Sequence, residues 1–457
     1  MVALAAPAPQ PRIEQVLVRS EPWLPLLIGV AWWAAMYPGL FGEDSLMNLT
    51  EARDGPVSVW FTAWWIYVIR FVTLGTRAIP LLTLFGVLTL TFAVRYWAAA
   101  CLPRGASRAL AICLVCASPL VGALGIQVRH DIEMTAGLLL CAAVVARAGD
   151  LAWPRIVDVM VLTFAVALIA TRHNGVAVVL AAAIGCVLVP ADGTFRQALL
   201  LFTVAGAVLA GTIVATRLAG HSEIADRLGA VEWAVTDISC LLSKDNVRVS
   251  TDEWNYLTTV ASPADWPQPN ACRFMDKELF AAASFHPDAV RARPMALLRA
   301  WLALARDNPL QMLRAHAERV RLFLPPFFTG VPRGDNLPFI HSTILPNDFE
   351  LEWKLPRLAG VVRLVARAWN AMAMFIANAG LWLLALVLSA KALGARGRAL
   401  RLTIYFAVAL EISVLVAAPM SEGRYGLFIL ITGQVAALTA LFEGYRGRLG
   451  SHSALGV

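Results

Sequence analysis

The feature that most restricts how this chain can fold is a series of apolar segments that recur along almost its whole length. A helix needs about 20 apolar residues to cross a bilayer, with about 17 as a practical minimum. Only 15% of the residues are charged, against about 25% in soluble domains. The sequence therefore predicts an all-α polytopic membrane protein with about ten transmembrane helices, some extended by polar flanks, at residues 23–40, 79–102, 109–126, 132–146, 156–171, 176–189, 198–216, 371–390, 402–418 and 427–442.

The basic residues predict the orientation of these spans. The chain carries a formal net charge of +7, and Lys and Arg accumulate in cytoplasmic loops. If the spans alternate, one side of the membrane receives Arg12, Arg19, Arg104, Arg108, Arg147, Arg155, Arg196, residues 391–401, Arg446 and Arg448. We expect that side, with both termini, to be cytoplasmic. The basic excess follows this membrane pattern, and no interleaved basic and aromatic patch indicates a nucleic-acid partner.

The spans divide the chain into three parts. Residues 1–217 are expected to form an N-terminal transmembrane module with catalytic outer loops, residues 218–367 a mainly helical extracytoplasmic segment, and residues 368–457 the last three spans. Within the middle segment, helices are predicted at 294–307 and 309–323, each with Pro in its first turn. The arginines of these stretches form either a solvated face or a surface for anionic lipid headgroups or phosphates. Cys240 and Cys272 can pair if the segment faces an oxidising compartment.

The first outer loop has an unusual composition. Trp60, Trp64, Trp65, Tyr67 and Phe71 lie between residues 48 and 76, and such aromatic side chains prefer the level of the lipid headgroups. A helix that lies in the membrane interface is the simplest interpretation. A hairpin of two half-spans is the alternative.

Directly before this loop stands the acidic motif Glu43-Asp44-Ser45. A carboxylate at the edge of the bilayer can deprotonate a hydroxyl nucleophile that lies within hydrogen-bond reach. It can also bind a divalent cation, or cap the helix that follows, since Asp and Ser are favoured N-cap residues.

Three further polar clusters fall at span ends on the same predicted side. The first is Arg129-His130-Asp131, followed by Glu133 inside a span, where an ionisable residue is a functional candidate. The second is Arg172-His173-Asn174, in which Arg172 either extends its charged end to the membrane surface or binds an anion. The third is Glu422-Gly423-Arg424-Tyr425, where the guanidinium of Arg424 suits phosphate oxygens or an ion pair with Glu422 or Glu411. Together the clusters predict a site that combines carboxylates with phosphate-binding arginines.

These residues and the order of the spans resemble the GT-C superfamily of membrane glycosyltransferases. The resemblance rests on Glu43-Asp44-Ser45 with the aromatic stretch after it, on His130-Asp131 in the second outer loop, on the long segment before the last spans, and on Arg424-Tyr425 in a late loop. A WWD-like motif is missing from the sequence, which argues against protein N-glycosylation. The sequence also lacks the P-loop, Rossmann, HExxH and GxSxG patterns.

The resemblance implies a transferase of the bacterial inner membrane whose site faces the periplasm. Its donor would be a polyprenyl-phosphate sugar, and its acceptor a glycan, lipid or protein of the envelope. Asp44 would be the general base with Glu43 as its rival, Asp131 would support it, and the donor phosphate would be held by Arg129, His130, Arg172, His173, Arg424 and Tyr425. No cofactor is required with certainty, and a divalent cation stays possible.

Two other functions are compatible with the same residues. A transporter or lipid flippase also places charges at span ends, although its broken helices usually lie near the bilayer midplane. A membrane acyltransferase requires a nucleophile or a histidine-based centre, for which only His130 and His173 are candidates.

Overall fold

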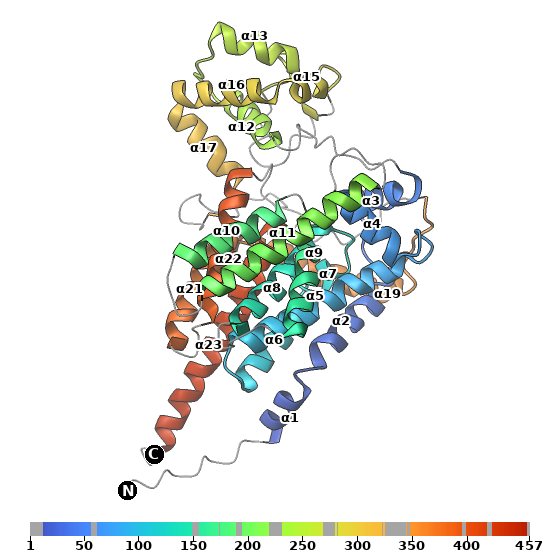
Figure 1. Ribbon diagram of the computed structural model, residues 1–457, viewed down its shortest axis with the longest axis vertical. Helices are drawn as coiled ribbons and strands as arrows, with labels where there is room; N and C mark the ends of the chain where they lie inside the picture. The colour runs from blue at the N-terminus through green and yellow to red at the C-terminus, as the bar shows by residue number, and fades with distance from the viewer. Residues whose placement is uncertain are drawn as a thin grey trace.

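The computed structural model describes residues 12–55, 62–148, 155–172, 174–188, 194–218, 231–267, 279–280, 282–321, 323–324, 344, 348–394, 399–417 and 423–454. The described part is helical, and its only β-type pairings are the isolated bridges Leu40–Gln127 and Phe41–Ile344. Figure 1 shows a large helical bundle with a smaller group of helices at one end.

The bundle is built around one helix that is buried on all sides. α8 (His130–Ala148) is buried at every position from Asp131 to Val145, as expected for a helix surrounded by other helices. It packs most extensively against α5 (Ile79–Cys101) and α9 (Ile156–Ile169). The other bundle helices are α1 (Arg12–Ser20), α2 (Leu24–Ala35), α6 (Ala106–Ala117), α7 (Gly122–Gly125), α10 (Gly175–Leu188), α11 (Thr194–Leu218), α21 (Ala379–Leu393), α22 (Leu400–Ala417) and α23 (Leu427–Ala454).

Three of the described helices are long and apolar enough to cross a membrane, within Ile79–Cys101, Arg196–Val214 and Leu427–Arg446. They agree with three of the predicted spans. Several other apolar helices are shorter, with 10–17 residues. The helical membrane character of the chain is therefore supported, while the number of ten spans is not established.

Several predicted spans have different boundaries in the structure: α2 ends at Ala35 and not at 40, and α23 continues to Ala454. Two further differences have a clear local cause. The span expected at 109–126 is divided into α6 and α7, because Ser118 adopts an extended conformation with ψ 154° before Pro119, and a residue before proline disfavours the helical region. The span expected at 371–390 begins only at Ala379. Asn378 caps that helix by accepting a hydrogen bond from the amide of Leu381 at 2.7 Å, so the helix has a defined start at this point.

The loop after α2 contains two helices, α3 (Glu43–Asp54) and α4 (Ala63–Val72). They pack against each other through Leu49, Trp65 and Ile69, which are fully buried together with Phe41. The indole of Trp64 donates to the carbonyl of Ala167 at 2.8 Å, which holds α4 against the end of α9. Neither helix is long enough to cross a bilayer.

The hydrophilic segment forms a group of helices with its own core: α12 (Glu232–Leu242), α13 (Thr251–Val260), α15 (Pro287–Ala292), α16 (Pro294–Asp307) and α17 (Pro309–Arg319). The predicted bounds of α16 are confirmed, and α17 ends four residues before the expected 323. Asp237 is fully buried and accepts from Arg319 Nε at 2.7 Å and from Trp301 Nε1 at 3.1 Å. Cys240 is disulfide-bonded, and Cys272 lies outside the described residues.

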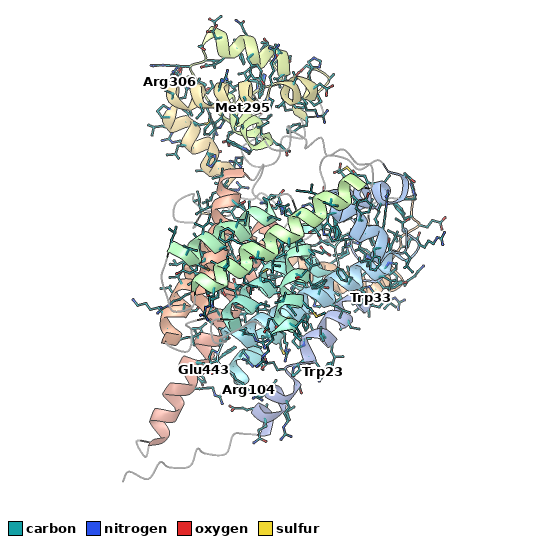
Figure 2. The ribbon with its side chains drawn as sticks, viewed as in Figure 1. Trp23, Trp33, Arg104, Met295, Arg306 and Glu443 are labelled. Atoms are coloured by element: carbon teal, nitrogen blue, oxygen red, sulfur yellow. The ribbon has the colours of Figure 1, made fainter. Side chains whose placement is uncertain are left out.

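These helices lie at the opposite end of the bundle from α1 and the end of α23. Figure 1 shows α12 to α17 at the top, and α1 and the end of α23 at the bottom. Arg104 and Glu443 lie at this lower end in Figure 2, far from Met295 and Arg306 on α16. We refer to the end that carries α12 to α17 as the upper end.

Candidate functional site

The site begins with the turn that leads from α2 into α3. Gly39 has a φ of +136°, and a Cβ at this position would lie 2.5 Å from Thr83 Cγ2 and 2.9 Å from the carbonyl oxygen of Ile126. Only glycine fits such a conformation in so little space. The amide of Leu40 donates to Ile126 O at 3.1 Å, so the turn lies beside the strand-like residues that precede Arg129.

This pairing brings the acidic motif Glu43-Asp44-Ser45 and the cluster Arg129-His130-Asp131 together. Arg129 Nη1 lies 3.4 Å from Asp44 Oδ2, and the side chain of Asp44 is 39% exposed while that of Arg129 is 6% exposed. Glu43 is exposed next to it. Neither Asp44 nor Ser45 caps α3, contrary to one prediction, because the N-cap position is occupied by Gly42. Both carboxylates instead stand in the first turn, where the helix dipole favours negative charge.

The cluster that contains Asp131 and the cluster that contains Arg172 meet in a buried ion pair. Asp131 is fully buried and contacts the guanidinium of Arg172, while His130 Nε2 lies 3.8 Å from the same carboxylate. The hydroxyl of Thr171 donates to the carbonyl of His130 at 3.3 Å. Thr62, the N-cap of α4, donates to the carbonyl of Thr171 at 2.9 Å. These bonds fix the end of α9 against the start of α8.

The cluster Glu422-Gly423-Arg424-Tyr425 contacts Arg172 through the aromatic ring of Tyr425. Tyr425 lies in the short 3-10 helix η2 (Gly423–Gly426), and its ring centroid is 4.4 Å from Arg172 Cζ. This distance is within the range of a cation–π contact. Gly426 allows the close approach, since a Cβ there would lie 2.8 Å from Ala379 Cβ and 3.1 Å from Phe323 Cε1. Phe323, which follows α17, and Ala379, at the start of α21, therefore pack closely against the backbone of Gly426, next to Tyr425.

Some predicted site residues are not placed in this arrangement. His173 and Glu422 lie outside the described residues, and of Arg424 only the backbone, in η2, is described. Glu133 is on another face of α8 from Asp131: a Cβ on Gly86 of α5 would lie 3.5 Å from its Oε1. Two residues along a helix correspond to a rotation of about 200°, so Glu133 does not share the side of α8 on which Asp131 meets Arg172.

The arrangement combines carboxylates, arginines and helix N-termini. The contacts from Asp44 to Tyr425 connect the N-terminal ends of α3, α8, α10 and α23. Helix N-termini carry unpaired amides and partial positive charge, and they bind phosphate and carboxylate groups. Arg129 and Arg172 add two positive charges, and Asp44 and Asp131 add two negative ones. Asp44 is the more accessible of the two paired carboxylates, so it can reach a ligand from which Asp131 is shielded.

Sequence reasoning placed these clusters on one side but missed how they pair. It assigned Arg129 to phosphate binding and left Arg172 open between anion binding and the membrane surface, whereas each contacts a carboxylate in the structure. No sequence signal specifies such partners. As to the possible cation, the described residues contain no group of three or more His, Cys, Asp or Glu side chains that could hold a metal ion.

Comparison with known proteins gives one similar structure. No model of a protein family and no curated protein matches the chain. The crystal structure of the Archaeoglobus fulgidus oligosaccharyltransferase, a complex with Zn and sulfate, is similar at 12% identity and a TM-score of 0.43 over 94% of this chain and 49% of that chain. This chain thus spans about half the length of that enzyme. A TM-score this low does not establish a shared fold.

Proposed function

We propose that the chain is an integral membrane glycosyltransferase of the GT-C type. It would move a sugar from a polyprenyl-phosphate donor to an acceptor hydroxyl of an envelope glycan, lipid or protein, on the periplasmic face of the bacterial inner membrane. The observation that carries the proposal is two neighbouring sets of contacts, Asp44–Arg129 and Asp131–Arg172–Tyr425, which place carboxylates and arginines at four helix N-termini.

The two carboxylates receive different roles because their surroundings differ. Asp44 has a side chain that is 39% exposed, so an acceptor hydroxyl can approach it and transfer a proton to it. The hydroxyl oxygen then attacks the anomeric carbon from the face opposite the lipid phosphate, which inverts that carbon. Asp131 is fully buried and would act by holding Arg172. Glu43, exposed beside Asp44, is the rival base.

The leaving phosphate would be stabilised by the arginines. A guanidinium carries five N–H donors in a planar fork that matches phosphate oxygens, and we assign Arg129 and Arg172 to the phosphate on this ground. Donors that stand ready for developing charge are the usual source of transition-state stabilisation. His130, His173, Arg424 and Tyr425 complete the proposed phosphate-binding set.

The proposal is tested with purified protein in proteoliposomes that contain a polyprenyl-phosphate sugar. Envelope glycans from a strain that lacks the protein identify the acceptor, which is then supplied outside the vesicles. We expect free polyprenyl phosphate to appear together with the glycosylated acceptor. Movement of the intact donor across the bilayer without cleavage would instead identify the alternative function, a transporter or flippase for envelope glycolipids.

The orientation gives a separate prediction. Thr258 on α13 and Arg104 at the lower end of the bundle are both exposed. In cells that express Thr258→Cys, a membrane-impermeant maleimide should label the new thiol directly, whereas Arg104→Cys should be labelled only after permeabilisation. The unsubstituted protein gives the background from native thiols. The reverse pattern would put the site on the cytoplasmic face and exclude a periplasmic acceptor.

Donor affinity gives another prediction. Arg424→Ala should weaken binding of the polyprenyl-phosphate sugar by about 1.5–3 kcal/mol, the range for hydrogen bonds to charged groups. Arg424→Lys should restore only part of the affinity, because a point charge lacks the planar fork. Equilibrium binding of radiolabelled donor to protein in nanodiscs measures both. Arg53→Ala, which removes an exposed arginine from α3, is the control, and equal affinity of the Arg424 and Arg53 variants would remove Arg424 from the site.

A further inference from the structure

One helix of the structure is amphipathic and largely exposed. α19 (Pro356–Ala371) follows the α12–α17 group and precedes α20 (Ala373–Ile376) and α21. It contacts α2 (Figure 1), and Ala359 is its buried position among those whose burial is described. Large apolar side chains stand 44–67% exposed along it and just beyond it: Leu358, Val361, Leu364, Val365 and Met372.

These side chains form one stripe. Leu358, Val361 and Val365 are spaced by three and four residues, which places them on the same side of a helix. An exposed apolar stripe of this kind marks a surface that another apolar phase covers. The stripe therefore requires a partner, and the charges of the helix indicate which one.

The charges on α19 have a single sign. Its sequence contains Arg357, Arg363 and Arg367 and no acidic residue. Arg363 Cζ lies 5.4 Å from the ring centroid of Trp353, and its buried Nε has no hydrogen-bond partner among the described residues. Basic residues beside an apolar stripe, with an aromatic ring at their level, are typical of helices that lie among anionic lipid headgroups.

Both ends of α19 are fixed near the candidate site. Before it, Trp353 Nε1 donates to Gly39 O at 3.3 Å and the amide of Lys354 donates to Tyr37 O at 3.2 Å, close to the turn that leads to Asp44. After it, the carbonyl of Ile376 accepts from Gln434 Nε2 at 3.3 Å. Ile376 ends the short helix α20, and Gln434 is seven residues into α23, about 10 Å along that helix from its start. The helix thus runs across the end of the bundle and not through it.

We propose that α19 is an interfacial helix that binds anionic phospholipid headgroups in the leaflet next to the candidate site. Its apolar stripe faces the acyl chains, and Arg357, Arg363 and Arg367 contact the phosphates. The proposal requires that the chain spans a membrane, and it does not depend on the transferase activity.

The test places a bimane label on Val361→Cys or on Leu302→Cys of α16, two positions that are 59% and 60% exposed. The full chain is reconstituted in phosphatidylcholine nanodiscs that contain a nitroxide-labelled lipid. We expect the nitroxide to quench the label at 361 strongly and the label at 302 hardly at all. Equal, weak quenching would overturn the proposal. Protection of the 361 label from both nitroxide lipid and aqueous iodide would show that protein, such as a second copy of the chain, covers the stripe.

The headgroup preference is measured at the same label. Nitroxide phosphatidylglycerol should quench position 361 more than nitroxide phosphatidylcholine, with about a fivefold preference for each arginine near the surface. The triple variant Arg357→Gln, Arg363→Gln, Arg367→Gln should lose this preference. The matched triple variant Arg299→Gln, Arg306→Gln, Arg314→Gln, which removes the same charge from exposed positions of α16 and α17, should keep it.

Loss of the preference in both triple variants, or its persistence in the α19 variant, would contradict headgroup binding. If the α19 triple variant does not fold, Arg357→Gln and Arg367→Gln give the same comparison with a smaller change, because both side chains are exposed. Transferase activity is not needed for any of these readings, so they stay valid even if the proposed function is wrong.

Discussion

Asp44→Asn is expected to lower the turnover of sugar transfer by about 10²–10⁴-fold, the usual contribution of a general base, while donor binding stays close to that of the unsubstituted protein. An asparagine has nearly the same size and accepts hydrogen bonds, but it cannot take a proton at neutral pH. The measurement is the rate of release of polyprenyl phosphate in the presence of acceptor, together with the equilibrium binding of the donor.

A loss of folding is not expected to explain this effect. The Asp44 side chain is 39% exposed, whereas that of Arg129, 3.4 Å away, is 6% exposed. The carbonyl oxygen of an asparagine can still accept a hydrogen bond from the Arg129 guanidinium, so the substitution does not leave Arg129 without a partner at this position. Glu43→Gln is the matched control in the same helical turn, and it should cost less activity than Asp44→Asn. If Asp44→Asn turns over normally and Glu43→Gln is inactive, then Glu43 and not Asp44 is the general base. Normal turnover of both variants would mean that the chain is not a transferase of this type.

The fold could be predicted well where one strong signal dominates. α5 begins at the predicted residue and ends within one residue of the predicted end, because a long apolar run has clear polar limits. The bounds of α16 are the predicted ones. Pro294 fixes the start of the helix, and its helical pattern of apolar residues ends at Asp307. The span at 109–126 was predicted as one helix, but it is interrupted at Ser118. Hydropathy measures only how apolar a segment is, and it carries no information on the backbone conformation that Pro119 imposes on Ser118.

The site could be predicted only as a set of neighbouring clusters. Charge alternation put Asp44, Arg129, Asp131, Arg172 and Arg424 on one side of the membrane, and the structure joins the first four in pairs. Which side chains pair depends on how each helix is rotated and how deep it lies, and both depend on packing around α8. The contact between Tyr425 and Arg172 joins segments more than 250 residues apart (425 − 172 = 253), for which a single sequence holds no register signal.

The burial of Asp131 leads to the second large effect that we expect. Arg172→Met leaves the fully buried carboxylate of Asp131 without its guanidinium partner. Removal of one member of a buried pair costs about 3–5 kcal/mol, because the remaining charge is uncompensated. Asp131→Asn should cost less, since Arg172 is 15% exposed and can turn its charge toward water while it keeps the ring of Tyr425. The free energy of unfolding in mixed micelles, titrated with denaturing detergent, measures both.

The double variant Asp131→Asn with Arg172→Met distinguishes a specific pair from general damage. If the two side chains act on each other, its loss of stability is smaller than the sum of the single losses, because the second substitution removes a charge that the first left unpaired. Arg306→Met is the control, since its pair with Asp307 is at the surface and its side chain is 76% exposed; it should cost at most about 1 kcal/mol. Additive losses would contradict the pair. If the losses are coupled and Asp131→Asn also binds the donor more weakly, the role of Asp131 is to hold Arg172 in position. Asp44 is then the carboxylate that contacts the acceptor.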